Sequence, residues 1–442
     1  MDRYEVIIVG AGAAGLAAAD ALRVQGRRVL VLEAAPSVGG LARAVLVGEE
    51  PIEAYYHHIF PQDAETRALI SRLGLGQNLE WLKGSMAILH GGRPYCFDSP
   101  ADLLRFSPLS LPSRLRTGLA TAACVLRPDK AHLDRVNVVD ESRTWFGAEA
   151  FELLWQPLLV AKFGPELYKR LPMAWLVARL RQRAGARRAG GDKLGYLRGS
   201  LGSLLDAYAA ELVGGGLELR TETPVSRISS EPSGWTVSGE GFELAAEAVI
   251  VAAAGGILTR LVPQLPSPYR DTLESIPYRG VVCALLELDR PVSRFYWTNL
   301  TEASAGGCVG IIEHTNLVPP ARYGGTHLIY LAHYVDPDSS TWTASGEELL
   351  AAATPALAAL NPDYERRWVT NISVSRDRFA QPVPQIGGPM PTLPLETGLP
   401  GLWHGSLAHI YPADRGLSEA LRLGQRLAAA ASEHLSSDHK GR

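Results

Sequence analysis

The sequence predicts an α/β protein built on a parallel sheet, and three observations support this fold class. First, the β-rich apolar run 4–9 leads through a glycine-rich turn into the alanine-rich helical pattern 16–24. Second, another apolar run, 28–32, follows at once and completes a strand-helix-strand unit. Third, the chain closes with a Leu/Ala-rich pattern, 417–435, which has the length of one long helix.

Later elements of the same sheet follow in chain order. The patterns predict an amphipathic helix over 199–212, strands over 217–220, 225–228 and 247–253, and a short strand at 402–403. Two long segments richer in Pro, Trp and Tyr separate these pieces. The first is mostly helical in pattern, and the second is strand-like at 281–288 and 326–334. We therefore expect a nucleotide domain formed by 1–60, 199–260 and 395–442, and a discontinuous α+β substrate domain formed by 61–198 and 261–394.

Composition and charge exclude several classes of protein. With 442 residues, 46% hydrophobic and 20% charged, the chain can bury a large core, and its net charge of −3 offers no basic footprint for nucleic acid. The four cysteines lie far apart without a C-x-x-C pair, so we expect reduced thiols and no metal site. The longest apolar run, 248–258, is shorter than the ~20 residues of a membrane helix. Because a signal-peptide pattern is also absent, we expect a cytoplasmic protein, at most peripheral at a membrane surface.

The turn after the first strand has the spacing of a dinucleotide-binding site. Gly10-Ala11-Gly12-Ala13-Ala14-Gly15 is G-x-G-x-x-G, in which the glycines serve a tight turn, close approach of the backbone to a pyrophosphate, and contact between helix and strand. Backbone N–H groups at the helix start then bind the phosphates. Glu33 ends the second strand, where a carboxylate accepts both ribose hydroxyls and repels a 2′-phosphate. This pattern predicts a Rossmann-type domain that binds FAD or NAD.

The residues after Glu33 distinguish between these two cofactors. The glycine pair Gly39-Gly40 lets the backbone approach a second stretch of an extended dinucleotide, and Arg43 can neutralise a phosphate. An acid followed by about five residues and Gly-Gly resembles the flavoprotein superfamily of amine oxidases, protoporphyrinogen oxidases and phytoene-type desaturases. The resemblance implies FAD as the cofactor and a Rossmann-type FAD-binding domain.

The resemblance extends to the later parts of the chain. Residues 202–205 with Val225 resemble the second FAD segment of the superfamily, and 412–418 with Gly424 resemble its C-terminal flavin segment. It implies that the backbone of Val225 meets the adenine, and that Gly416, Leu417 and Ser418 open a helix that faces a flavin carbonyl. Many relatives have a glycine and an acid on the ribityl chain, where this sequence has Gly405 and Ser406; a serine hydroxyl can still hydrogen-bond there.

Two neighbouring histidines and a Glu-His pair are candidate catalytic or flavin-positioning residues. His57 and His58 lie where relatives have Asp-x-Gly-x-His near the flavin ring, and both a flavin-positioning or catalytic role and a packed loop remain open. Glu313 and His314 follow a strand-like run. They either line the pocket or form a hydrogen-bonded strand end, and the second reading is favoured.

Tyr411 and Arg415 flank the inferred flavin segment. They either stabilise reduced flavin and hold substrate, or Asp414 and Arg415 form a plain cap pair. Some flavin amine oxidases place a lysine near the flavin, but Lys162 is read as a solvated helix end.

Two further patterns have a plain and a functional interpretation. The run of arginines between 179 and 188 is read as a solvated face that could attract an anionic group. The leucine-rich stretch 103–119, interleaved with arginines, is read as substrate-domain core, with a membrane-surface or channel-lid role as the alternative. Pro108 and Pro112 exclude one long amphipathic helix across it.

The sequence therefore predicts a FAD-dependent oxidoreductase. It removes a hydride from a C–H or C–N bond of a bulky apolar small molecule, such as a polyprenoid or tetrapyrrole, and an amine is a weaker candidate. A second G-x-G-x-x-G after a strand is missing, so the expected electron acceptor is diffusible, oxygen or a quinone. The alternatives are a non-redox isomerase of nucleotide sugars resembling UDP-galactopyranose mutase, or a flavin-binding protein without turnover.

Overall fold

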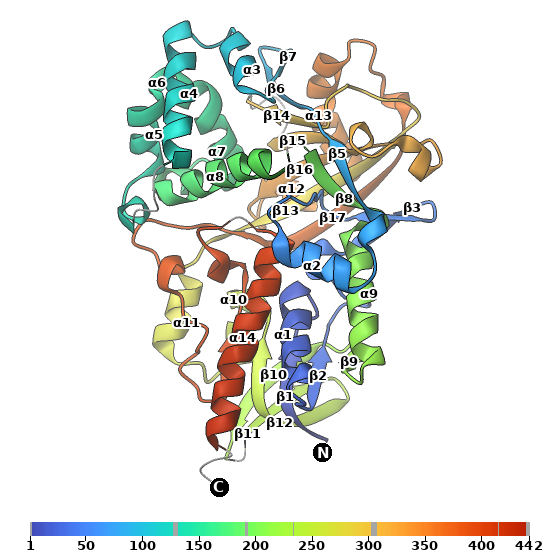
Figure 1. The fold of residues 1–442 in the computed structure, drawn as a ribbon, viewed down its shortest axis with the longest axis vertical. Helices are drawn as coiled ribbons and strands as arrows, with labels where there is room; N and C mark the ends of the chain where they lie inside the picture. The colour runs from blue at the N-terminus through green and yellow to red at the C-terminus, as the bar shows by residue number, and fades with distance from the viewer. Residues whose placement is uncertain are drawn as a thin grey trace.

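A computed structural model describes residues 2–126, 131–190, 193–232, 234–301, 307–413 and 415–438. Figure 1 shows two stacked halves: one holds both ends of the chain, a sheet and the long helices α1 and α14, and the other holds a second sheet and a group of helices. The predicted α/β class is confirmed.

The first sheet contains the predicted nucleotide-binding strands. Its order is β10-β11-β12-β1-β2-β9, and β18 pairs with the end of β12. The strands are β1 (Arg3–Val9), β2 (Val29–Leu32), β9 (Glu218–Arg220), β10 (Val225–Glu231), β11 (Gly234–Gly239), β12 (Phe242–Val251) and β18 (Leu402–His404). β1 lies parallel to β2 and β12, and its residues Val6 to Val9 are buried. Burial on both faces explains the continuous apolar run in the sequence.

Helices cover both faces of this sheet. α1 (Ala13–Val24), α9 (Ser200–Gly214) and α14 (Leu417–Asp438) form one core with it, and α10 (Gly255–Leu261) and α11 (Ser267–Glu274) pack on the other face. α1 and α14 lie against each other (Figure 1). A Cβ added to Gly424 would lie 2.2 Å from the carbonyl oxygen of Ala14, so Gly424 permits this close helix packing.

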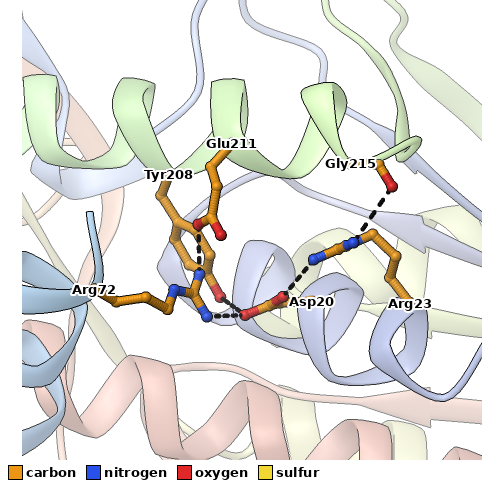
Figure 2. A network of polar contacts seen from close by, with 6 residues as sticks. All are labelled: Asp20, Arg23, Arg72, Tyr208, Glu211 and Gly215. Carbon is orange, nitrogen blue, oxygen red and sulfur yellow. Dashed lines mark hydrogen bonds and ion pairs between the residues drawn. The ribbon is translucent and has the colours of Figure 1, made fainter. Parts of the chain in front are cut away.

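A polar network fastens α1 to α9 and to α2 (Ala64–Arg72) (Figure 2). The carboxylate of Asp20 accepts hydrogen bonds from Arg72 and from the hydroxyl of Tyr208 at 3.0 Å. Arg72 also bonds to Glu211 at 2.9 Å and lies over the ring of Tyr208. Asp20 is buried, so these partners supply the hydrogen bonds that water would otherwise provide.

The second sheet joins two segments that are far apart in the sequence. Its order is β17-β13-β16-β15-β14-β6-β7. The strands are β6 (Met86–His90), β7 (Arg93–Cys96), β13 (Tyr278–Leu288), β14 (Trp297–Leu300), β15 (Cys308–Glu313), β16 (His327–Val335) and β17 (Val369–Pro382). The parallel pairing of β6 with β14 joins the segment before residue 100 to the segment after residue 270. Two short pairs complete the strands: β3 (Ala44–Val47) with β4 (Glu50–Glu53), and β5 (Leu79–Lys83) with β8 (Lys193–Leu197).

Helices cover this second half as well. They are α3 (Pro100–Arg105), α4 (Leu111–Leu126), α5 (Val138–Phe146), α6 (Ala148–Ala150), α7 (Gln156–Phe163), α8 (Met173–Gly190), α12 (Ser340–Thr343) and α13 (Gly346–Leu360). α3 and α4 are separate helices, as the two prolines predict. Within the described ranges, no helix combines the length and apolar character that crossing a bilayer requires.

Candidate active site

A large cavity runs from the glycine-rich turn of the first half to the helices of the second. Its volume is about 1250 Å³, and it is lined by the start of α1, the end of β2, the segment 55–60, the helices α4, α7 and α8, and the chain around 405–420. Sites for one drug-sized ligand have volumes of about 300–1,000 Å³. The cavity therefore has room for an extended dinucleotide and a second molecule.

The glycine-rich turn has the geometry that a diphosphate requires. Gly10 has φ +108°, and a Cβ on Gly15 would lie 1.9 Å from the carbonyl oxygen of Gly10, so both positions demand glycine. A Cβ on Gly12 would meet no atom within 4 Å, which leaves open space before the first turn of α1. No side chain caps that turn, so its backbone N–H groups are available to an anion.

Glu33 is fixed at the edge of this space. Its carboxylate accepts hydrogen bonds from the backbone N–H of Ala11 at 2.7 Å and of Ala35 at 2.9 Å. Glu33 lines the cavity, so its remaining lone pairs can accept the hydroxyls of a ribose. The open space, the uncapped helix and this acid together fit the adenosine diphosphate part of FAD.

Most of the predicted cofactor residues lie on the cavity wall. Those that line it are Gly10, Gly12, Ala14, Glu33, Gly39, Gly40, Val225, Gly405, Ser406, Gly416 and Leu417. Three others lie behind the wall. Gly15 packs against Gly10. Arg43 bonds to the hydroxyl of Tyr55 at 2.8 Å and lies 3.7 Å from Asp377. The hydroxyl of Ser418 bonds to Thr66, so it joins α14 to α2.

The far end of the predicted FAD path is built by α14 and Arg415. Gly416 and Leu417 bring the positive end of α14 to the cavity, which stabilises negative charge. The guanidinium of Arg415 donates to the carbonyl of Ala380 and to the hydroxyl of Tyr334. It also lies 5.2 Å from the centre of the Tyr334 ring. Asp414, the other half of the suggested cap pair, lies outside the described residues.

A family model described as flavin containing amine oxidoreductase matches residues 13–399. The chain belongs to this family. It is accordingly a FAD-dependent oxidoreductase with FAD as its cofactor. Over 85 residues it is 39% identical to the putrescine oxidase of Kocuria rosea, in an alignment that spans 19% of this chain and 18% of that protein.

Solved structures of the same fold cover almost the whole chain. The chain is similar to a provisionally named protoporphyrinogen oxidase from Exiguobacterium sp. 255-15, with a TM-score of 0.75 and 18% identity over 97% of this chain and 98% of that one. A putrescine oxidase variant gives 0.74 and 19% over 98% and 99%, and reduced UDP-galactopyranose mutase gives 0.74 and 16% over 97% and 96%. Because the identities are below 20%, these similarities establish the fold of this flavin containing amine oxidoreductase and not its substrate.

Both histidine candidates of this amine oxidoreductase lie on the cavity wall, and both are also hydrogen-bonded. Nδ1 of His57 bonds to the carbonyl of Tyr55, and Nδ1 of His58 lies 3.3 Å from the hydroxyl of Tyr296. Burial lowers the pKa of His57 to about 4 and that of His58 to about 3. The two rings are therefore neutral near pH 7.

Of the three other catalytic candidates, Arg415 lines the cavity, and Glu313 and Tyr411 do not. The buried carboxylate of Glu313 accepts hydrogen bonds from the N–H groups of Val292 and Ser293 and from the Ser293 hydroxyl. Its oxygens thus hold the chain at 292–293, which is the hydrogen-bonded strand end that the sequence favours. His314 is buried as well and bonds to Tyr323. The hydroxyl of Tyr411 donates to Asp134, which ties the C-terminal segment to the helical group.

Three cationic residues that the sequence predicts to be solvated line the cavity. They are Lys162, read as a helix end, and Arg179 and Arg183, read as a charged face; Arg183 is exposed as well. Arg179 and Arg183 are four residues apart on α8, so they lie on one face of the helix. This spacing could have indicated that both side chains reach the same site. The side chains of Arg187 and Arg188 lie outside the described residues.

The leucine-rich stretch 103–119 is only partly the core that the sequence predicts: Phe106 and Leu109 are buried, but most of its other leucines are not. Leu104 and, on α4, Leu111, Leu115, Leu119 and Leu126 are exposed, with 74% exposure for Leu119. Thr117, Thr121 and Val125 of α4 line the cavity, and so does the exposed Leu126 at the end of the helix. α4 therefore forms part of the cavity wall and turns an apolar face outward.

Proposed function

We propose that this enzyme oxidises a bulky, mostly apolar small molecule, of the size of a polyprenoid or a tetrapyrrole, by removing a hydride from a C–H or C–N bond. The observation that supports this is the second part of the cavity, beyond the predicted FAD path. Its wall there is largely apolar, with Leu154, Leu158, Leu159, Leu176, Leu180 and Val125. Apolar walls favour an apolar ligand through the hydrophobic effect.

When bound, FAD supplies the acceptor for the hydride. The chain's own residues orient the substrate, exclude water and set the charge around it. Neutral His57 and His58 add no charge to the wall, and Arg415 together with the start of α14 makes the adjoining part electropositive. A diffusible oxidant, oxygen or a quinone, completes the proposed cycle.

We also propose the domain division expected from the sequence. Residues 1–60, 199–260 and 395–442 supply the sheet that contains β1, and 61–198 and 261–394 supply the sheet that contains β13. Residues from both parts line the cavity. Closure of the two parts around a substrate would therefore exclude water from it.

Anaerobic mixing with candidate substrates tests the proposed reaction. The purified holoenzyme is incubated without oxygen with a polyprenoid, a porphyrinogen or a diamine, and the flavin absorbance is followed. Bleaching by one of the two bulky apolar compounds, with little effect of the diamine, is the expected result. Bleaching by the diamine alone would contradict the apolar substrate class. Conversion of a nucleotide sugar by dithionite-reduced enzyme, without net electron use, would favour the isomerase alternative.

We further propose that the outer face of α3 and α4 rests on an anionic lipid bilayer. The exposed leucines of this face are flanked by Arg105, Arg114 and Arg116, and anionic headgroups complement these charges. The inner side of α4 lines the cavity, so an apolar substrate dissolved in lipid has a short path inward.

Co-sedimentation with vesicles tests this surface. Binding to phosphatidylglycerol-rich vesicles is expected, with weaker binding to pure phosphatidylcholine. The double variant Leu115→Ser and Leu119→Ser is expected to bind at least about tenfold more weakly, because each buried leucine contributes roughly 1.5–3 kcal/mol. The control is Val213→Ser, which changes an apolar residue of 47% exposure on α9. Equal loss in the control, or no binding by the wild type, would contradict the proposal.

A further inference from the structure

Two buried polar groups on the helical side of the cavity have no hydrogen-bond partner among the described residues. One is the hydroxyl of Thr117 on α4, a residue that is 3% exposed, and the other is the indole N–H of Trp155. Both residues line the cavity. Such groups are rare, because a buried donor without a partner loses the hydrogen bond that water would provide. A ligand in the cavity can supply a partner for both.

A second threonine on the same wall shows the ordinary arrangement. Thr121, one turn after Thr117 on α4, also lines the cavity, but its hydroxyl donates to the carbonyl of Thr117 at 2.8 Å. Val125 on α4 and Leu154 beside Trp155 add apolar surface to the wall. Among the described residues, the two groups without a partner are therefore polar points in apolar surroundings. A few polar groups placed in this way fix the orientation of a bound ligand.

α5 connects the two groups to each other. Arg116, next to Thr117, donates from its guanidinium to the carbonyl of Thr144 on α5 at 2.7 Å. The ring centre of Phe146, at the end of α5, lies 5.0 Å from that of Trp155. Both groups therefore belong to one packed set of helices. Figure 1 shows α4 and α5 apart from α14, whose start builds the predicted flavin end.

The backbone at Trp155 departs from a regular α-helix. Trp155 ends a π-helical turn, Phe151–Trp155, which lies between α6 and α7. Pro157, the second residue of α7, has no N–H to donate to the helical ladder. π-helical turns inside α-helices are frequent at functional sites. This turn is a second observation, independent of the hydrogen bonds, that favours a binding role for Trp155.

The chemistry of the two groups limits what they can bind. An indole N–H only donates, whereas a threonine hydroxyl both donates and accepts. A shared partner must therefore accept a hydrogen bond, which an oxygen does and an ammonium group does not. Thr117 and Trp155 are neutral and have apolar neighbours, so a neutral oxygen costs less free energy to bury among them than a carboxylate.

We infer that Thr117 and Trp155 bind a neutral oxygen of the substrate, a hydroxyl or a carbonyl, at the end away from the predicted flavin. This inference rests on the proposed function, because it adds one oxygen to the same apolar substrate. It disfavours a diamine, whose ammonium groups have no lone pair for the indole N–H.

Four ligands with one common ring system test the inference. They are methylpyrene, pyrenemethanol, acetylpyrene and pyrenemethylamine, the last of which is protonated at neutral pH. Binding to the FAD-loaded enzyme is measured by the quenching of pyrene emission by the flavin. The quantity compared is the affinity of each polar ligand relative to that of methylpyrene. This ratio cancels the contribution of the ring system and of a change in cavity volume.

Variants assign the ratio to the two residues. Thr117→Val keeps the shape of the side chain, and Trp155→Phe keeps an aromatic ring. Each is expected to lower the ratio of an oxygen ligand about fivefold, because each removes one hydrogen bond. The oxygen ligand with the larger fall identifies the group as hydroxyl or carbonyl. Trp155→Phe is expected to leave the ratio of pyrenemethylamine unchanged. The matched control is Thr121→Val, which is expected to keep all ratios, because its hydroxyl is bonded within α4.

Thermal unfolding of the FAD-loaded variants gives a readout that a purely structural role would change. Thr117→Val is expected to unfold at the same temperature as the wild type or at a higher one, because valine buries no hydroxyl without a partner. A lower unfolding temperature would show that the hydroxyl stabilises the fold itself, and it would overturn the inference.

The outcomes separate the two proposals. If the pyrenes bind but the ratios are the same in the wild type and in both variants, the inference is overturned and the apolar substrate class stands. The same holds if Trp155→Phe lowers the ratio of pyrenemethylamine as much as that of the oxygen ligands. If none of the four binds, the apolar substrate class itself fails, and the inference fails with it.

Discussion

Replacement of Gly12 by valine is expected to give a folded protein that no longer retains FAD. Gly12 has φ −72° and ψ 177°, which any residue adopts, and no atom lies within 4 Å of the added Cβ. The new side chain would fill the open space before α1 and keep a diphosphate from its N–H groups. Hydrogen bonds to a charged group contribute roughly 1.5–3 kcal/mol each, so we expect FAD affinity to fall by about 100-fold or more.

The measurement is an FAD titration together with circular dichroism and thermal unfolding. Gly214→Val is the matched control, because its Cβ also meets no atom within 4 Å and it lies at the end of α9. This control is expected to keep FAD. Gly15→Ala, in contrast, is expected to damage the fold, because its Cβ would lie 1.9 Å from the carbonyl oxygen of Gly10. Wild-type FAD affinity in Gly12→Val would place the diphosphate elsewhere.

A steep loss of stability is expected as the pH falls below about 6.5. Burial lowers the pKa of several histidines far below the ordinary value of 6.5. These are His57, His333 and His409, to about 4, and His58, His314 and His404, to about 3. The folded chain therefore binds fewer protons than the unfolded chain between these values and 6.5. The stability that these neutral rings contribute is present above pH 6.5 and is lost as the pH falls.

Three carboxyls act in the opposite direction. Burial raises the pKa of Glu53 and of Glu313 to about 7 and that of Asp63 to about 6, so their contribution is present at low pH and is lost as the pH rises through these values. The histidines outnumber them, and at pH ~5.5 unfolding takes up about three protons net, a loss of about 4 kcal/mol per pH unit. Urea unfolding at several pH values between about 5 and 8 measures this slope. Stability that is constant or rises on acidification would contradict the buried, neutral histidines.

Local patterns predicted most of the nucleotide-binding half of the fold, but not β11 or the first part of β12. The strand-helix-strand unit appears as β1, α1 and β2, and the expected strand 247–253 lies within the last part of β12 and the two residues after it. The glycine spacing and Glu33 predicted their own placement, because a short turn is determined by residues that are close in sequence. The fold class was confirmed for the same reason.

The substrate half depended on contacts that no local pattern contains. Lys162 faces the cavity because α7 packs against β14, β15 and β16 of the second sheet, and spacing around one lysine carries no information about that packing. The leucines of α4 look like core in the sequence, but the helix has the cavity on one side and an open face on the other. For Glu313 the sequence favours a hydrogen-bonded strand end, but it does not identify the partners, the N–H groups of Val292 and Ser293.

The most direct test of this account is to identify what the folded protein carries between its two halves. Purified protein is denatured, the released small molecule is separated and weighed, and its amount is compared with that of the chain. The account predicts one FAD per chain. A folded, colourless preparation that takes up no added FAD, or one that releases a nicotinamide dinucleotide instead, would contradict it.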